Sequence, residues 1–264
     1  MKSPKPGNSL TAGSVRLYLV SRPALSPKNI QRFLADEDTS WRRSTGATAA
    51  EEVVELGGRL CYMSFGSNQS SKTTGEYIAN LISLGHESVL EHATWTILIT
   101  GVSRAFSHQL VRHRVGFAFS QLSQQYHDET DAKFVMPEFL RGHPRAIAIW
   151  SELVDRSRYA YRAIQKEIDI SSEELGAKEN RRAVRSAARS VLTNSTETKI
   201  LLTVNARAIR HFLEVRGSIP GDIEMRRVSA LLLELMRAEA PRIFDDFEVT
   251  NLSDGSPSVH LKKN

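Results

Sequence analysis

The chain has 264 residues, of which 41% are hydrophobic and 25% charged, a composition typical of a globular protein that buries a sizeable core. No apolar run approaches the roughly 18 residues that a membrane-spanning helix needs, and residues 1–13 lack the apolar stretch of a secretion signal. The single cysteine, Cys61, excludes an internal disulfide framework. We therefore expect a cytoplasmic protein, with one domain favoured over two.

The formal net charge of +5 indicates an anionic partner. A nucleic acid, a membrane surface and a phosphorylated small molecule all fit the net charge. The basic residues form no lysine-rich tail, and many arginines lie inside apolar segments with helical periodicity. Guanidinium groups in such segments favour bidentate binding of phosphate or carboxylate over loose electrostatic steering.

The predicted elements begin after a short N-terminal tail. Residues 1–13 are rich in Lys, Pro, Ser and Gly, so we expect disorder there, whereas residues 15–20 alternate as a strand does. Thr73 and Glu76 have the spacing of a capping box, which predicts a helix that Gly85 closes.

A β-branched run over residues 94–100 predicts a strand that leads through Gly101 to a helix starting near Ser103. We expect this helix to end in the Arg-His-Arg triplet at 112–114. Gly116 then breaks the helix, and a polar loop is expected to follow.

The second half of the chain is mainly helical in pattern. Helices are predicted over residues 145–168 and 178–192, and a strand over 196–204 leads to a helix with Asn205 as its N-cap. A last helix is predicted over residues 224–240, stopped by the proline that follows.

Helices mixed with a few separated strands, without regular alternation, favour an α+β fold. The sequence has no Gly-x-Gly-x-x-Gly or Walker-type loop, so a standard dinucleotide-binding or P-loop fold lacks its signature. The helices at 145–168 and 224–240 carry more apolar surface than one buried stripe requires, which indicates subunit contacts.

The Arg-His-Arg triplet is the centre of the strongest candidate site. Gln109, Arg112 and His113 fall at i, i+3 and i+4, so a helix would place them on one face at its C-terminal end. Cations there can also simply complement the helix dipole. Residues 120–126 add hydroxyls and amides, groups that bind an imide edge or a phosphate. Together these features predict a nucleotide-binding site.

These residues resemble the signature of the flavin-dependent thymidylate synthases (the ThyX family), which is Arg-His-Arg, seven residues, then serine. The similarity continues in the segments 85–92, 188–192 and 205–216, in the same order. It implies an α+β domain over residues 14–250, with a central, mostly antiparallel sheet flanked by helices. Residues 251–264 are then expected to form a C-terminal tail.

The resemblance also implies the site residues, and FAD as cofactor. The implied flavin contacts are His86, Ser88, Arg112, His113, Arg114, Gln121, Asn205, Arg207 and His211. The implied nucleotide contacts are Gln109, Arg112, Gln121, Leu122, Ser123, Gln125, Arg189 and Arg216. Arg216 and Ser123 are the implied catalytic residues, with Arg216 corresponding to the arginine that polarises the uracil and favours its N3-ionised form.

The implied reaction is reductive methylation of uracil C5, which converts dUMP to dTMP with methylenetetrahydrofolate as carbon source and NADPH as reductant of the flavin. The implied assembly is a homotetramer with shared active sites. The other thymidylate synthase class attacks C6 with a cysteine thiolate, which needs an electropositive setting. Because Cys61 lies far in sequence from every motif, we interpret it as a small buried hydrophobe and expect Arg216 to activate the uracil instead.

Three departures from the family fall in the nucleotide-facing half. Eight residues, 115–122, separate Arg114 from Ser123, Gln125 replaces the arginine of the family's Ser-x-Arg-Tyr, and Thr193 stands where proline is usual. An amide cannot replace a bidentate, charged contact. We therefore hypothesise a broadened specificity that includes UMP, because a longer loop ending in Gln125 offers room and a polar partner for the 2′-hydroxyl.

Three alternatives remain open. One is a UMP-preferring methylase of a modified-nucleoside pathway, and another is a paralogue that binds flavin without turnover. The third is a nucleic-acid-binding protein without flavin, motivated by the net charge and by Arg181, Arg182 and Arg185. No metal is expected, because His86 and His92 lack the i, i+4 spacing of a zinc hydrolase.

Overall fold

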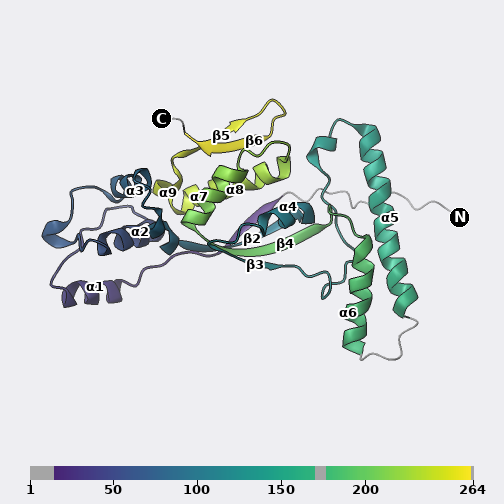
Figure 1. The fold of residues 1–264 in the computed structure, drawn as a ribbon, viewed down its shortest axis with the longest axis horizontal. Helices are drawn as coiled ribbons and strands as arrows, with labels where there is room; N and C mark the ends of the chain where they lie inside the picture. Colours follow the sequence, from purple (N-terminus) through teal and green to yellow (C-terminus); the bar gives the residue numbers. More distant parts are fainter. Residues whose placement is uncertain (1–14, 170–176, 263–264) are drawn as a thin grey trace. The chain divides into compact units, whose positions relative to one another are not determined.

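The computed structural model describes residues 15–169 and 177–262. Helices and strands are mixed along the chain, and an antiparallel sheet is flanked by helices (Figure 1), which confirms the predicted α+β class. The tail predicted at residues 1–13 lies outside the described residues. In the described ranges, none of the helices combines the length and apolarity needed to cross a bilayer.

The strands form two sheets. Their bounds are β1 (Arg16–Ser21), β2 (Thr94–Ser103), β3 (Phe117–Gln121), β4 (Glu197–Asn205), β5 (Phe247–Asn251) and β6 (Pro257–Leu261). The larger sheet has the order β1-β2-β4-β3, and β5 pairs with β6 in an antiparallel hairpin. Strand β6 therefore falls within the stretch that the sequence predicted as a C-terminal tail.

Most of the helices lie at predicted positions, but no prediction was made for the helices over residues 27–36, 49–60 and 241–244. Their bounds are α1 (Pro27–Asp36), α2 (Ala49–Leu60), α3 (Thr74–Ser83), α4 (Arg104–Leu110), α5 (Pro144–Asp169), α6 (Ala177–Ala188), α7 (Ala206–Arg216), α8 (Ile223–Glu239) and α9 (Pro241–Phe244). Short 3₁₀ segments lie at Gly66–Asn68 (η1), Glu87–His92 (η2), Glu138–Leu140 (η3) and Arg189–Val191 (η4). The predicted capping box of Thr73 and Glu76 and the predicted cap at Asn205 are both confirmed.

Contacts divide the chain into two compact units. Unit 1 comprises Met1–Arg16, Ile99–Arg112 and Ser120–Leu201, and unit 2 comprises Leu17–Leu98, His113–Phe119 and Leu202–Asn264. Strands β1, β2, β3 and β4 each contribute residues to both units.

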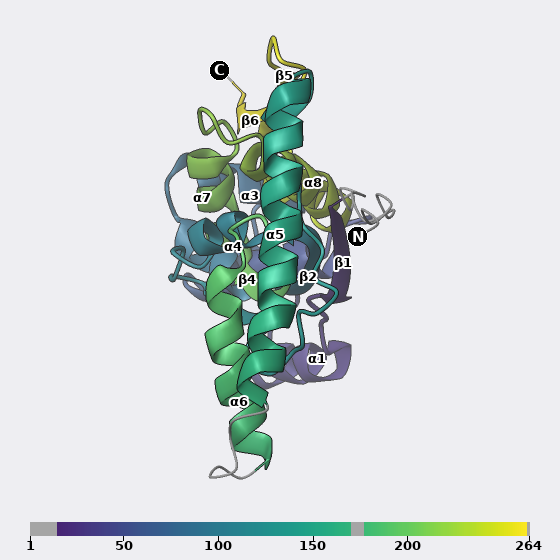
Figure 2. The ribbon, with the colours of Figure 1, turned by 90° about the vertical axis from the view of Figure 1, so that its right-hand side faces the viewer.

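In unit 1, the helices α5 and α6 pack side by side (Figure 2). Val154 of α5 is buried in a cluster with Ala132 and Phe134. Tyr161, also buried on α5, accepts a hydrogen bond through its hydroxyl from the Glu129 amide at 3.0 Å. Helix α5 thus anchors the chain that follows β3.

In unit 2, the core lies among α7, α8, α9 and the β5–β6 hairpin. Trp95 and Phe244 are fully buried and meet edge to face, with ring centroids 6.3 Å apart. Leu232, Leu233 and Met236 of α8 are also buried, so this helix uses most of its apolar surface inside its own unit.

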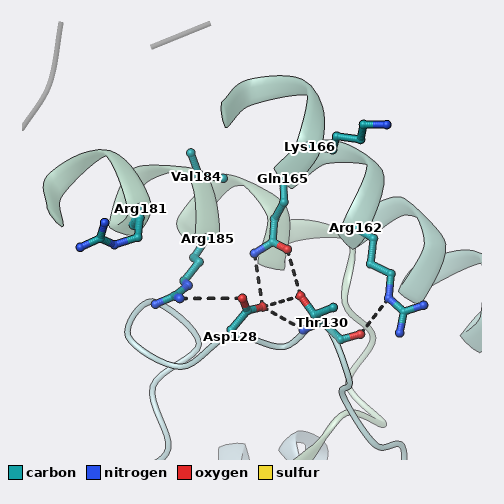
Figure 3. A pocket seen from close by; sticks show the side chains of 8 residues that line it. All are labelled: Asp128, Thr130, Arg162, Gln165, Lys166, Arg181, Val184 and Arg185. Carbon is teal, nitrogen blue, oxygen red and sulfur yellow. Dashed lines mark hydrogen bonds and ion pairs between the residues drawn. The ribbon is translucent and has the colours of Figure 1, made fainter. Parts of the chain in front are cut away.

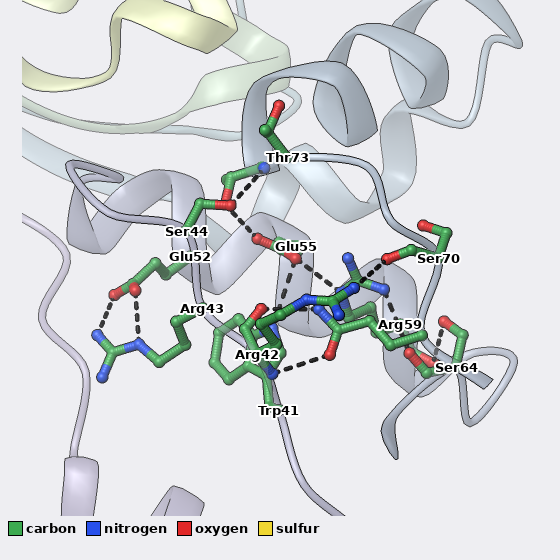
Figure 4. A network of polar contacts seen from close by, with 12 residues as sticks. Trp41, Arg42, Arg43, Ser44, Glu52, Glu55, Arg59, Ser64, Ser70 and Thr73 are labelled. Atoms are coloured by element: carbon green, nitrogen blue, oxygen red, sulfur yellow. Dashed lines mark hydrogen bonds and ion pairs between the residues drawn. The ribbon is translucent and has the colours of Figure 1, made fainter. Parts of the chain in front are cut away.

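Helix α2 carries buried carboxylates that the composition does not reveal (Figure 4). Glu51, Glu52 and Glu55 are each at most 5% exposed. Glu55 is the hub, because it accepts hydrogen bonds from Arg59 Nε at 2.7 Å, Thr74 Oγ1 at 2.6 Å and Trp41 Nε1 at 3.4 Å. The guanidinium of Arg59 is itself fully buried, so these bonds hold an ion pair away from water.

Two predictions around the Arg-His-Arg triplet were wrong. Helix α4 ends at Leu110, so the triplet lies beyond it and Gln109, Arg112 and His113 do not share a helix face. The Arg112 amide donates to the Gln109 carbonyl at 3.2 Å, a tightened turn that ends the helix. The predicted polar loop begins only after Gln121. Residues 117–121 form strand β3 instead, because pairing in the sheet satisfies their backbone hydrogen bonds.

Candidate active site

The last residue of α7 contacts the middle residue of the triplet. Arg216 Nε donates a hydrogen bond to His113 Nε2 over 3.0 Å. Both side chains are half-buried. Helix α7 is well defined at its start, where the Asn205 side chain accepts a hydrogen bond from the Ala208 amide at 2.9 Å. The cap and the helix together determine where Arg216 lies.

The His113 ring lies among aromatic side chains of unit 2. Its centroid is 5.2 Å from that of Phe212 and 6.0 Å from that of Phe117, and it meets the ring of His211 edge to face at 6.4 Å. Burial, the charge of Arg216 and that of His211 lower the pKa of His113 below its ordinary value. The imidazole is therefore neutral near pH 7, as an acceptor for Arg216 must be.

The remaining predicted flavin contacts of unit 2 surround the start of α7. Arg207 Nη1 binds Glu91 Oε1 at 2.6 Å, and Arg207 Nε lies 3.7 Å from Glu87 Oε2, so α7 packs against η2. His86 caps η2 and Ser88 lies within it. The side chains of the following predicted contacts are exposed: His86, Ser88, Arg114, Arg207 and His211.

Gly116 holds the turn after the triplet against the start of α7. Its φ of +73° is in the left-handed region, and its carbonyl accepts a hydrogen bond from the Asn205 amide at 3.2 Å. A Cβ atom at this position would lie 2.7 Å from Cβ of Ala208 and 2.8 Å from Nδ2 of Asn205. Only glycine fits both the conformation and the space.

We expect Gly116→Ala to lower the free energy of unfolding by about 1–3 kcal/mol, because it combines backbone strain with a clash against α7. Chemical denaturation of the purified variant measures this. Gly142→Ala is the matched control, since Gly142 has a φ of +87° but a Cβ atom there would meet no other atom within 4 Å. Equal losses in the two variants would contradict the role assigned to close packing.

Gln121, at the end of β3, is oriented by two hydroxyls of unit 1. Its Nε2 donates to Ser107 Oγ at 2.8 Å and to Thr198 Oγ1 at 3.1 Å. Ser107 in turn donates to the Arg104 carbonyl. The amide nitrogen is thereby committed to the protein, which leaves the carboxamide oxygen of Gln121 to accept from a ligand.

The turn after β3 is held by backbone hydrogen bonds. Leu122 donates its amide to the Lys199 carbonyl at 2.9 Å, and its own carbonyl accepts from Arg104 Nη1 at 3.3 Å. Ser123 Oγ accepts from the Gln125 amide at 3.3 Å. The predicted nucleotide contacts Leu122, Ser123 and Gln125 therefore form one local turn.

Two arginines raise the positive potential near this turn. Burial lowers the pKa of Arg104. The negative charge of Glu129 raises this pKa, and the like charge of Arg189 lowers it further. Arg189 is an exposed residue of η4. Arg104 was not among the predicted site residues. Its position at the start of the Arg-Ala-Phe-Ser-His segment, directly after β2, could have indicated it.

A cavity of about 470 Å³ in unit 1 lies next to the same turn (Figure 3). Burial opposes ionisation of Asp128 there, but hydrogen bonds from Thr130 and Gln165 hold the pKa of Asp128 below its usual range. Arg185 lies 3.8 Å from Asp128 and donates to the Tyr126 carbonyl at 2.8 Å. None of the predicted site residues lines this cavity, and the hydrogen bond from Arg185 to Tyr126 joins its lining to the residue that follows Gln125.

The structure thus groups the predicted residues in two sets. His113, His211 and Arg216 lie together in unit 2, with Asn205 and Arg207 on the same helix. The predicted residues of unit 1 are Gln109, Arg112, Gln121, Leu122, Ser123, Gln125 and Arg189. The sequence did not single out Gly116 and Phe212 as parts of the site, because their roles depend on close approach in three dimensions.

Comparisons with known proteins identify the family of this chain. Residues 45–242 match the family model described as "Thymidylate synthase complementing protein". Relatives named "Flavin-dependent thymidylate synthase" include one from Mycolicibacterium gilvum, 42% identical over 85% of this chain and 89% of the relative. Others are from Corynebacterium aurimucosum, 38% identical (85% and 90% covered), and Mycobacterium tuberculosis, 40% identical (85% and 89% covered).

The α+β fold, the cationic site and these similarities define a methyl-transferring enzyme of the flavin-dependent type. The chain belongs to the flavin-dependent thymidylate synthase family.

Proposed function

We propose that the protein methylates C5 of the uracil in a uridylate nucleotide. It converts dUMP to dTMP and also accepts UMP, with methylenetetrahydrofolate as carbon source and NADPH as reductant. The observation that carries this proposal is the orientation of Arg216 by a neutral His113 over 3.0 Å. A positive group held in a fixed direction stabilises the negative charge that develops on a uracil ring when C5 becomes nucleophilic.

FAD is the proposed cofactor, and the exposed groups of unit 2 fit its chemistry. Arg114 and His211 offer positive or donor groups for its phosphates, while Ser88 offers a hydroxyl. Arg207 contributes less net charge, because Glu91 and Glu87 partly neutralise it. When bound, the flavin supplies the hydride chemistry, and the residues of this chain bind and orient it.

Arg216 activates the substrate in this mechanism. Its guanidinium favours the N3-ionised uracil by charge, and the oxygen of Gln121 and the hydroxyl of Ser123 position the nucleotide. Cys61 was expected to be buried, but it is exposed at the C-terminal end of α2, where its thiol donates to the Gly57 carbonyl. The proposed mechanism, in which Arg216 activates the uracil by charge, assigns no nucleophilic step to Cys61.

The breadth of substrate choice is the finer part of the proposal. Gln125 is half-buried and its backbone amide donates to Ser123 Oγ, so its backbone is held in the same turn as Leu122 and Ser123. Its neutral amide can both donate to and accept from a 2′-hydroxyl, which a guanidinium cannot do. Because an amide at this position can bind a 2′-hydroxyl but does not require one, we expect both UMP and dUMP to be methylated. A UMP-preferring methylase of a modified-nucleoside pathway is the alternative within this proposal.

The experiment has two stages. The visible absorbance of the purified protein reports bound flavin, and mass spectrometry of the product reports methylation of dUMP and UMP under identical conditions. Yellow protein that methylates both nucleotides is the expected result. Colourless protein with salt-sensitive nucleic-acid binding would favour the nucleic-acid alternative, and bound flavin without turnover would favour the inactive paralogue. Strict preference for dUMP would remove UMP from the proposal.

We further propose that the active enzyme is a cytoplasmic homotetramer with shared active sites. Helix α5 supports this, because Ile149, Leu153 and Tyr159 are 63%, 55% and 74% exposed. Apolar side chains of this size on one helix indicate a surface that another subunit covers. Light scattering of the holoenzyme tests the assembly, and a fully active monomer would contradict it.

A further inference from the structure

We propose that His113 is a positioning residue that fixes the direction of Arg216 without cancelling its charge. This inference rests on the proposed function, in which Arg216 acts on the uracil. The geometry is a single hydrogen bond of 3.0 Å from Arg216 Nε to His113 Nε2. Because this bond uses only Nε, both Nη groups stay available to bind a ligand in a bidentate way.

Other arginines of unit 2 show how unusual this partner is. Arg210 binds Asp246 through both Nη groups at 2.7 and 2.6 Å, and Arg242 binds Glu51 at 2.5 Å. In each case a carboxylate neutralises the guanidinium. Across residues 15–169 and 177–262, by contrast, no carboxylate forms an ion pair with Arg216. A neutral imidazole therefore orients Arg216 while its full positive charge remains available.

The surroundings of His113 keep the ring both fixed and neutral. Phe212 of α7 and Phe117 of β3 pack against it with centroids 5.2 and 6.0 Å away, and neither carries charge. The charged or titratable groups that act on it are Arg216 and His211, both from α7. Burial and these two groups lower the pKa of His113, so its protonation requires a lower pH than that of an unperturbed histidine.

Protonation of His113 would end its positioning role. A proton on Nε2 turns the acceptor into a donor and places a second cation against Arg216. The hydrogen bond between the two side chains then breaks, and the guanidinium of Arg216 is no longer held in one orientation. We therefore expect turnover of the wild-type holoenzyme to fall on the acid side, as the pH decreases through the lowered pKa of His113.

The test measures ionisation of a bound ligand rather than activity alone. The probe is 5-fluoro-dUMP, whose N3 ionisation is followed by ultraviolet absorbance during a pH titration of the flavin-loaded enzyme. Wild type should lower the apparent pKa of N3, and Arg216→Ala should abolish that effect. His113→Glu keeps an acceptor in place but cancels the charge of Arg216, so it should lose most of the effect and about a hundredfold in kcat.

His113→Gln is the conservative variant, because its side-chain oxygen reaches the position of Nε2 and stays neutral. It should retain the N3 effect and keep kcat within about tenfold of wild type, while the acid-side loss of activity disappears. His260→Gln is the matched control: this histidine lies 3.2 Å from Glu248 in the β5–β6 hairpin and is not among the proposed site residues, so the acid-side loss should persist in this variant.

The outcomes separate the two claims. An N3 effect that survives Arg216→Ala overturns the role of Arg216 in the proposed function. An effect lost in Arg216→Ala but fully kept in His113→Glu overturns only the positioning role of His113. Loss in His113→Gln as large as in His113→Glu also overturns it, because charge would then make no difference.

Discussion

Arg216→Ala should lower kcat by at least about a hundredfold while the fold persists. Removing one donor from the group that stabilises developing negative charge typically costs about 3–4 kcal/mol of barrier. The side chain is half-buried and its hydrogen bond is to His113, a half-buried neutral ring, so the truncation leaves no buried charge unpaired. Steady-state kinetics give kcat and KM, and circular dichroism checks the fold.

Two comparison variants sharpen this result. Arg22→Ala removes the same charge from a side chain that binds Glu239 at 3.4 Å and is 65% exposed, so kcat should stay within about twofold. Arg216→Lys keeps the charge but loses the planar fork, so its kcat should fall between those of wild type and Arg216→Ala. Full turnover in Arg216→Ala would contradict both the proposed mechanism and the inference about His113.

Glu55→Gln should destabilise the protein by about 3–5 kcal/mol, because it leaves the fully buried charge of Arg59 without its counter-ion. The neutral amide has nearly the same shape, so the loss reports charge rather than a cavity. Trp41 and Thr74 also lose one of the two carboxylate oxygens of Glu55 as a hydrogen-bond acceptor or keep it at reduced charge. Chemical denaturation monitored by fluorescence or circular dichroism gives the free energy of unfolding.

The same helix supplies the control. Glu52 is buried too, but its partner Arg43 has a side chain that is 48% exposed and can return to water, so Glu52→Gln should cost only about 1 kcal/mol. Replacing both members of the buried pair, Glu55→Gln with Arg59→Met, should recover part of the lost stability. A double variant no more stable than Glu55→Gln would show that an unpaired charge is not the cause.

Local signals in the sequence predicted much of the secondary structure. The capping box at Thr73 and Glu76 and the N-cap at Asn205 were recognised because their hydrogen bonds join residues three positions apart. The strand before Ser103 and the helix after it were also confirmed, although β2 continues through Gly101. Such features depend on neighbouring residues, which a pattern in the sequence displays directly.

Features that depend on distant residues were missed or misplaced. Helical periodicity extended α4 into the Arg-His-Arg triplet, whereas pairing in the sheet makes the chain leave the helix at Leu110 and form β3. No pattern indicated that Glu55 and Arg59 are buried, because charged residues are usually solvated and only the packing of Thr74 and Trp41 against them removes water.

The sequence alone was enough to predict the α+β class and the enzyme family, since motifs and caps are encoded within short segments. It also predicted a cationic site for a nucleotide. Which groups meet was decided only in three dimensions. His113 and Arg216 are separated by more than a hundred positions along the chain, yet one hydrogen bond joins them. Folding also brings the start of α7 against the turn at Gly116, a close approach between residues nearly ninety positions apart that no short segment displays.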